Sequence, residues 1–88
     1  MNIDENNLRD VSIEILSRDR IGLMAEITEI VAGFDVQTVH YDAKVLSDDH
    51  GERLFECKIS VCVDNNKLRM LHNRLYRIRG VLKFSVSS

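Results

Sequence analysis

Histidine and cysteine are the residue types in this sequence with the widest chemical repertoire, because they ligate metals and act as bases or nucleophiles. The chain has three histidines, His40, His50 and His72, and two cysteines, Cys57 and Cys62. The histidines fall on a predicted strand, a turn and a helix, and the cysteines lie on opposite faces of one predicted strand. No nucleophile stands within predictable reach of a base, so we expect no catalytic residue, no metal site and no cofactor. The two thiols are expected to be reduced and structural.

A second kind of chemistry, the binding of an anion, is indicated at residues 17–24, where an alternating apolar stretch gives way to a helical pattern. The first amides of a helix have no partner inside it, and the helix dipole makes that end positive. We expect the N–H groups of Gly22, Leu23 and Met24 to be available to a carboxylate, and the glycine lets a ligand or another backbone come close. The alternative is structural: Asp19 caps the helix and satisfies these amides itself.

Charge is distributed unevenly along the chain. Residues 1–35 contain eight acidic side chains and three arginines, whereas residues 64–83 contain one acid, Asp64. The basic side chains in that second stretch are Lys67, Arg69, Arg74, Arg77, Arg79 and Lys83. One interpretation is a solvated basic helix face, because the dipole favours cations near a helix C-terminus. The other is that Arg69, Arg74, Arg77 and Arg79 form a docking surface for an acidic protein or for ribosomal RNA phosphates.

The elements that position these residues follow from hydrophobic periodicity. Alternation predicts strands at 10–16, 36–46, 55–63 and 81–86, and three- and four-residue steps predict helices at 23–33 and from the N-cap Asp64 to Gly80. Residues 47–51 are expected to form a hairpin turn, and Gly33 is expected to end the first helix in the left-handed conformation. This order is two split βαβ units. It predicts an α+β, ferredoxin-like βαββαβ fold, with a four-stranded antiparallel sheet and two helices on one face.

One face of that sheet is covered by helices and the other is open. The covered face is expected to hold Val11, Ile13, Ile15, Val39, Tyr41, Val45, Phe55, Cys57, Ile59, Val61, Leu82 and Phe84. The open face is expected to hold Ser12, Glu14, Thr38, His40, Asp42, Lys44, Glu56, Lys58, Ser60, Lys83 and Ser85. RNA-binding sheets of this kind need exposed aromatic rings on which bases stack, and the open face has none. Sequence-specific RNA recognition by the sheet is therefore not expected.

Length and composition limit the class of protein. The chain has 88 residues, a net charge of −2, 30% charged and 44% apolar residues. We expect one globular domain over residues 10–88 and a linker or leftover segment at residues 1–9. A core of this size gives marginal stability, so a partner subunit is plausible. No apolar run approaches the roughly 20 residues of a membrane span and no secretory signal is visible, so we expect a cytoplasmic protein without membrane contact.

The stretch Asp19-Arg20-Ile21-Gly22-Leu23-Met24, after a strand in a βαββαβ chain, resembles an ACT domain. The ACT motif there reads Asp-Arg-x-Gly-Leu-Leu, and Met24 replaces the last leucine. The resemblance covers residues 8–87. Residues 55–59, Asp64 and the stretch 75–81 make the chain similar to the C-terminal ACT domain of the RelA/SpoT guanosine tetraphosphate synthetase/hydrolase family, the GTP pyrophosphokinases. One departure is Asp35-Val36, where such domains often carry Asn-Ile or Asn-Val; an acid there would repel a carboxylate or hold an ammonium group.

The resemblance implies a regulatory domain of stringent-response control that forms a homodimer and binds a free amino acid between subunits. The implied site residues are Asp19, Arg20, Ile21, Gly22, Leu23 and Met24 of one chain, with Val36, Gln37 and Thr38 of the partner subunit. The synthetase and hydrolase chemistry of that family lies in other domains, so this chain alone is not expected to be an enzyme. The alternative is a pure interaction module for self-association or ribosome docking, without a small-molecule ligand.

Overall fold

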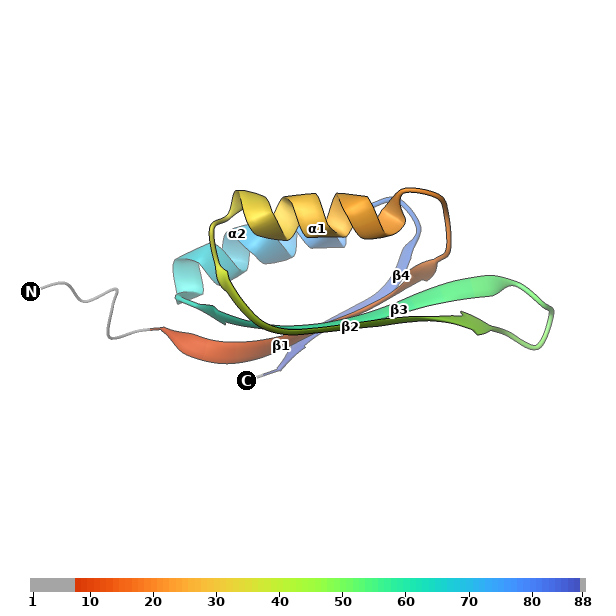
Figure 1. Cartoon of the computed structure of the whole chain (residues 1–88), viewed down its shortest axis with the longest axis horizontal. Coiled ribbons are helices and arrows are strands. Elements are labelled where there is room, and N and C mark those ends of the chain that lie inside the picture. Colours follow the sequence, from red (N-terminus) through yellow and green to blue (C-terminus); the bar gives the residue numbers. More distant parts are fainter. Residues whose placement is uncertain (1–7, 88) are drawn as a thin grey trace, which may run out of the picture.

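A computed structural model describes residues 8–87 of the chain, apart from the side chain of Val39. The elements are β1 (Arg9–Arg18), α1 (Leu23–Gly33), β2 (Gln37–Ser47), β3 (Arg53–Val63), α2 (Asn65–Tyr76) and β4 (Val81–Ser87). Figure 1 shows both helices on one side of a single sheet, with the β2–β3 hairpin reaching past the start of α1. Of the linker expected at residues 1–9, residues 1–7 lie outside the described part, and Arg9 is the first residue of β1.

The sheet has the strand order β2-β3-β1-β4, and all neighbouring strands are antiparallel. The ferredoxin-like α+β fold predicted from the sequence is therefore confirmed. Strands β1 and β3 form the centre, where Ile13 lies opposite Ile59 and Ile15 opposite Cys57. Strands β2 and β4 form the two edges of the sheet.

The core lies between the sheet and the helices. Alternate residues of β1 and β3 supply its sheet side, and both helices turn their apolar stripes onto it. The buried members are Val11, Ile13, Ile15, Leu23, Ile27, Val31, Phe55, Cys57, Ile59, Val61, Val63, Leu71, Leu75 and Ile78. Full burial of a large apolar side chain contributes about 1.5–3 kcal/mol. The packed central strands and helices therefore hold the ends of the loops between them in fixed positions.

A β-bulge in β2 corrects one expectation about the sheet faces. The register against β3 shifts between Thr38 and His40, so Thr38 lies opposite Val61, a core residue. Thr38 is therefore on the helix-covered side, and not on the open face as alternation predicted. A bulge adds one residue to a strand and so inverts the alternation on one side of it.

A second bulge, in β4, corrects another expectation. The register of β4 against β1 shifts so that Val81 lies opposite Ser17, which is fully buried. Val81 packs against the core, whereas Leu82, expected on the covered face, is exposed. Val81 therefore points toward the core, where alternation had placed Leu82.

The helix ends agree with the sequence in part. Asp64 is the N-cap of α2, as predicted, and its Oδ1 accepts a hydrogen bond from the N–H of Lys67 at 2.7 Å. Helix α2 ends at Tyr76, earlier than the predicted end at Gly80. Helix α1 ends at Gly33 as expected, but the left-handed residue after it is Asp35, with φ 52°. Aspartate tolerates this conformation better than most residues, because its short side chain bonds locally.

Candidate ligand site at the start of helix α1

The loop at residues 19–22 joins β1 to α1 and is anchored by backbone hydrogen bonds on both sides. The N–H of Arg18 donates to the carbonyl of Gly80 at 3.0 Å, and the N–H of Asp19 donates to the carbonyl of Arg53 at 3.1 Å. Gly80 has φ 98°, and a Cβ there would stand 3.3 Å from the Oγ of buried Ser17. Glycine is thus what lets this turn approach the end of β1 so closely.

Asp19 does not cap α1. Its Oδ2 lies 3.3 Å from the Nε of Arg53 on β3. The N-cap is Gly22, with φ 84° and ψ −3°, and it has no side chain to cap the helix. The structural alternative, in which Asp19 satisfies the helix amides, is therefore wrong. No described atom lies within 4 Å of a Cβ built on Gly22, so conformation rather than crowding inside the chain requires glycine there.

The amides of the first turn of α1 are satisfied in part. The N–H of Leu23 donates to the carbonyl of Arg20 at 3.3 Å, which removes one of the three amides expected to be available. The helical series begins where the N–H of Glu26 donates to the carbonyl of Gly22 at 2.9 Å. The cap residue Gly22 has no side chain that could accept from the N–H of Met24. A carboxylate against this turn would gain about 0.3–1 kcal/mol from the helix dipole, besides hydrogen bonds.

Arg20 lies across the base of the loop and is already paired. Its guanidinium bonds to Glu26 in the first turn of α1, and its Nε donates to the carbonyl of Arg79 at 3.5 Å. The side chain therefore ties the loop to α1 and to the turn that follows α2. A ligand carboxylate would have to compete with Glu26 for this guanidinium.

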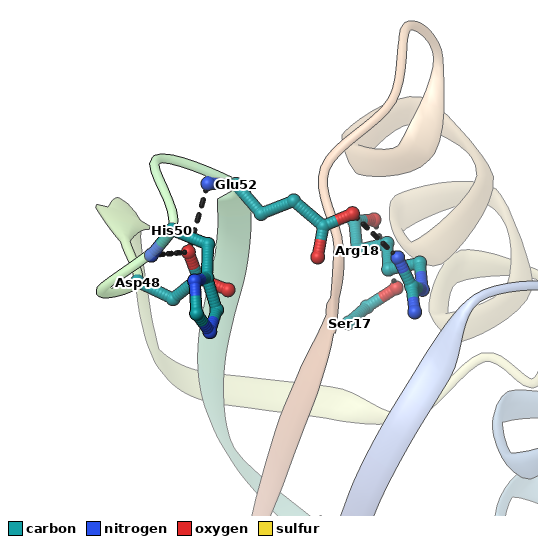
Figure 2. A network of polar contacts seen from close by, with 5 residues as sticks. All are labelled: Ser17, Arg18, Asp48, His50 and Glu52. Atoms are coloured by element: carbon teal, nitrogen blue, oxygen red, sulfur yellow. Dashed lines mark hydrogen bonds and ion pairs between the residues drawn. The ribbon is translucent and has the colours of Figure 1, made fainter.

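The β2–β3 hairpin holds the other side of the loop. Figure 2 shows Glu52 reaching from the hairpin to Arg18 at the end of β1, where Oε1 and Nη1 are 2.7 Å apart. The turn itself is fixed by Asp48, whose Oδ1 accepts from the N–H groups of His50 and Glu52, both at 2.8 Å. The three basic and three acidic side chains around the loop are thus paired with one another. A charged ligand group would meet backbone dipoles there rather than an unpaired ion.

The apolar side chains of the loop differ in their roles. Leu23 is buried in the core, whereas Ile21 is 101% exposed and Met24 is exposed as well. The hydroxyl of Tyr41 on β2 donates to the Sδ of Met24 at 3.2 Å. Burial and the neighbouring Cys57 thiol raise the pKa of Tyr41 far above its ordinary value, so this hydroxyl stays a proton donor. Ile21, at the tip of the anchored loop, thus makes no contribution to the core of this chain.

The other predicted site residues, Val36, Gln37 and Thr38, lie beyond the opposite end of α1. The helix has 11 residues and is about 16 Å long, so it separates these residues from the loop. The structure therefore places residues 19–24 together but does not join them to residues 36–38 of the same chain. That separation is consistent with the implied origin of the two groups in different subunits.

A groove between α1 and β2 was not expected from the sequence. It has a volume of about 400 Å³ and is lined by Thr28, Val31, Ala32, Val36, Thr38 and Tyr41. Val31 and Ala32 are three and four residues after Thr28, so the three residues lie on one side of the helix. This side of the groove could have been predicted from the sequence. The β2 side depends on the bulge before His40, which alternation does not reveal. The polar groups of the groove are hydroxyls, and that of Thr28 donates to the carbonyl of Met24 at 2.8 Å.

Histidine and cysteine side chains do not gather into a site in the described part of the chain. No group of three or more histidine, cysteine or acidic side chains that could hold a metal occurs among residues 8–87. Cys57 is buried, which raises the pKa of its thiol, and Cys62 is half-buried; both are free. None of the described helices is long and apolar enough to cross a membrane.

The predicted docking residues Arg69, Arg74, Arg77 and Arg79 are exposed on α2 and in the turn after it. Arg69 donates to the side-chain oxygen of Asn66 at 2.7 Å. The ion pairs found among the described residues involve none of these four arginines. Their charge is therefore left for solvent or for a partner.

Comparison with known proteins adds the family. The sequence matches the model of the ACT domain over residues 5–85, and no curated protein matches it. The crystal structure of the ACT domain from GTP pyrophosphokinase of Chlorobium tepidum has a TM-score of 0.71 and 25% identity, covering 91% of this chain and 99% of that one. The solution NMR structure of the same domain gives 0.69 and 24%, covering 93% and 89%. An unknown protein from Galdieria sulphuraria gives 0.78 and 18%, covering 92% and 49%.

Proposed function

Because the chain belongs to the ACT domain family, we propose that it is the regulatory domain of a (p)ppGpp synthetase/hydrolase, and that it dimerises and senses a free amino acid. The likeness to the ACT domain of a GTP pyrophosphokinase supports this choice of parent protein. ACT domains are regulatory and not catalytic, so synthesis and hydrolysis would take place in other domains. The domain would act in stringent-response control in the cytoplasm.

The observation that carries the proposal is the open start of α1. Gly22 leaves the helix without a side-chain cap, and the space above it is free of described atoms. The loop before it is anchored at Arg18 and Asp19, so its amides are held in place before a ligand arrives. Ile21, fully exposed beside these amides, would cover the bound molecule.

A second copy of the chain would complete the site. One chain cannot bring residues 36–38 to its own loop, because α1 lies between them. In the partner subunit, Asp35 stands next to those residues, exposed and in the left-handed conformation. Its carboxylate suits the ammonium group of an amino acid, while the helix amides of the first chain suit the carboxylate.

Calorimetric titration with valine, leucine, isoleucine and serine tests the proposal. We expect heat of binding with at least one of them, and loss of that heat in Gly22→Leu, which fills the space above the helix start. Gly51→Leu is the matched control, since Gly51 also has a positive φ, 79°, and open space around it, but lies in the hairpin turn. Absence of heat with all four amino acids up to millimolar concentration, in a chain that dimerises, would refute amino-acid sensing. If Gly22→Leu unfolds while Gly51→Leu stays folded, Gly22 has a structural role.

The second candidate function is docking to the ribosome or to an acidic protein through α2. It is favoured by the unpaired arginines of α2 and the turn after it. Reversing the charge of Arg74 and Arg77 should then weaken co-sedimentation of the parent protein with ribosomes, and the remaining association should depend less on salt. Unchanged association across salt concentrations would rule out this surface.

A further inference from the structure

Met24 is the residue at which the stretch 19–24 departs from the ACT motif, which has leucine there. It is the second residue of α1, and its side chain is 42% exposed. Its sulfur accepts a hydrogen bond from the hydroxyl of Tyr41 at 3.2 Å, whereas a leucine could accept none. The departure from the motif therefore adds an exposed thioether, which can be oxidised, to the start of the helix.

Tyr41 holds this sulfur at the edge of the proposed ligand site. The side chain of a helical residue leans toward the N-terminus of its helix, so the sulfur of Met24 lies beside the first turn of α1. One turn further along, the hydroxyl of Thr28 donates to the carbonyl of Met24 at 2.8 Å. Burial raises the pKa of Tyr41, so its hydroxyl keeps its proton and remains a donor to the atom that faces it.

A second exposed methionine provides a comparison within the same chain. Met70 is 50% exposed on α2, outside residues 19–24 and 36–38 of the proposed site. Exposure alone therefore makes both sulfurs accessible to a soluble oxidant. The two differ in position, because Met24 faces Tyr41 at the start of α1 and Met70 lies on the other helix. A chemical change at Met24 would alter the surroundings of the first amides of α1, and the same change at Met70 would not.

We propose that Met24 is a modification site, at which a peroxide converts the thioether to a sulfoxide and so weakens amino-acid binding. One lone pair of the sulfur accepts the Tyr41 hydrogen bond, and the other attacks an oxygen of hydrogen peroxide. A sulfur–oxygen bond forms and the oxygen–oxygen bond breaks. The sulfur loses two electrons, and the second oxygen leaves as water with both protons of the peroxide. Sulfoxide reductases reverse the change, with two thiols oxidised to a disulfide and the oxygen released as water.

The sulfoxide differs from the thioether in polarity. Its oxygen carries a partial negative charge and accepts a hydrogen bond more strongly than a thioether sulfur does. The unbranched methionine side chain can adjust so that the Tyr41 hydroxyl donates to this oxygen. A partial negative charge then lies beside the amides that a ligand carboxylate would use, and it repels that carboxylate. The effect on affinity rests on the proposed amino-acid site, whereas the new hydrogen bond to Tyr41 does not.

The fluorescence of Tyr41 reports the modification without a ligand. The chain has two tyrosines and no tryptophan, so Tyr76→Phe leaves Tyr41 as the source of tyrosine emission. In that background, hydrogen peroxide should change the emission in step with the Met24 sulfoxide, which mass spectrometry of peptides measures. The change should disappear in Met24→Leu and persist in the matched control Met70→Leu. Emission that stays constant while Met24 is fully converted, or that follows the oxidation of Met70, would overturn the proposal.

Calorimetric titration before and after peroxide treatment tests the consequence for binding. In Met70→Leu, conversion of Met24 should lower the affinity for an amino acid about twofold to fivefold. In Met24→Leu, the affinity should be the same before and after peroxide. By reciprocity, the bound amino acid should slow the oxidation of Met24 in the unmodified chain and leave that of Met70 unchanged.

Two results separate this proposal from amino-acid sensing. Equal affinity of the reduced and oxidised chains would overturn the proposal for Met24 and leave amino-acid sensing intact. Absence of heat in the untreated chain would refute amino-acid sensing, and the emission of Tyr41 alone would then decide whether Met24 is the modification site.

Discussion

Three glycines in the left-handed conformation allow a test of how the loop before α1 is anchored, by comparing the stability that each loses on substitution by alanine. Gly22, Gly51 and Gly80 have φ values of 84°, 79° and 98°. Alanine at each should therefore cost about 1–2 kcal/mol of stability from backbone strain alone. At Gly22 and Gly51 the added Cβ would meet no described atom within 4 Å, but at Gly80 it would stand 3.3 Å from the Oγ of Ser17.

The extra cost at Gly80 follows from what surrounds that contact. Ser17 is fully buried, so its side chain cannot swing into solvent and the turn must shift instead. That shift stretches the 3.0 Å hydrogen bond from the Arg18 N–H to the Gly80 carbonyl. Weakening one such bond costs about 0.5–1.5 kcal/mol. We therefore expect Gly80→Ala to lose about 2–3 kcal/mol in total, about 1 kcal/mol more than Gly22→Ala or Gly51→Ala.

Urea unfolding followed by circular dichroism measures these differences, with an unchanged m-value as the check that the denatured state is the same. Combining Gly80→Ala with Ser17→Ala removes the crowded oxygen, so the penalty at Gly80 should shrink by about 0.5–1 kcal/mol in that background. Equal losses for the three alanine variants would refute the reasoning, because strain alone would then explain them. A Gly80 penalty that is the same with and without the Ser17 hydroxyl would refute it as well.

Three further predictions follow from single contacts. Folding raises the pKa of Tyr41 above its ordinary 10.0. The tyrosine of the unfolded chain therefore ionises first, and the free energy of unfolding should fall as pH rises above 10. Thermal unfolding at about pH 8 and about pH 11 should show a smaller loss of stability for Tyr41→Phe than for the unmodified chain. Asp64→Ala removes the acceptor of the 2.7 Å hydrogen bond from the Lys67 N–H, and urea unfolding should show a loss of about 1 kcal/mol. Asp19→Asn weakens the pair with Arg53, whose side chain is largely exposed, so the loss should be no more than about 1 kcal/mol, measured by chemical unfolding.

Much of the fold could be predicted from local pattern, because the elements follow from periodicity alone. The alternation of β3 and the four-residue steps of α2 both identify the core residues correctly, as Cys57, Ile59, Leu71 and Leu75 show. Alternation fails at Thr38 and Leu82, because Thr38 comes directly before one bulge and Leu82 occupies the other. A bulge is set by the pairing of two strands, and a single strand's sequence does not show it.

The candidate site was predictable in position but not in detail. Gly22 and the helix start are local features, so the motif located them. The partner of Asp19 is Arg53, on a strand that is distant in sequence, and a capping interpretation based on neighbours alone was bound to miss it. The end of α1 was also missed in detail. Glycine is the usual residue in the left-handed conformation, so the sequence favoured Gly33, but the structure has Asp35 in that conformation instead.

If the proposed site binds an amino acid, its energetics would link that binding to dimerisation. The charged side chains at the loop are paired among themselves, so one chain offers a ligand carboxylate mainly the first amides of α1. The dipole contributes about 0.3–1 kcal/mol, and a tenfold gain in affinity needs about 1.4 kcal/mol, so this end alone would bind an amino acid weakly. In the proposed site the ammonium group would need Asp35 or another group of the partner subunit, since the acid of the loop, Asp19, is paired with Arg53. The apparent affinity for the amino acid should therefore rise with protein concentration until the dimer is saturated, and an affinity independent of protein concentration below that point would place the whole site in one chain.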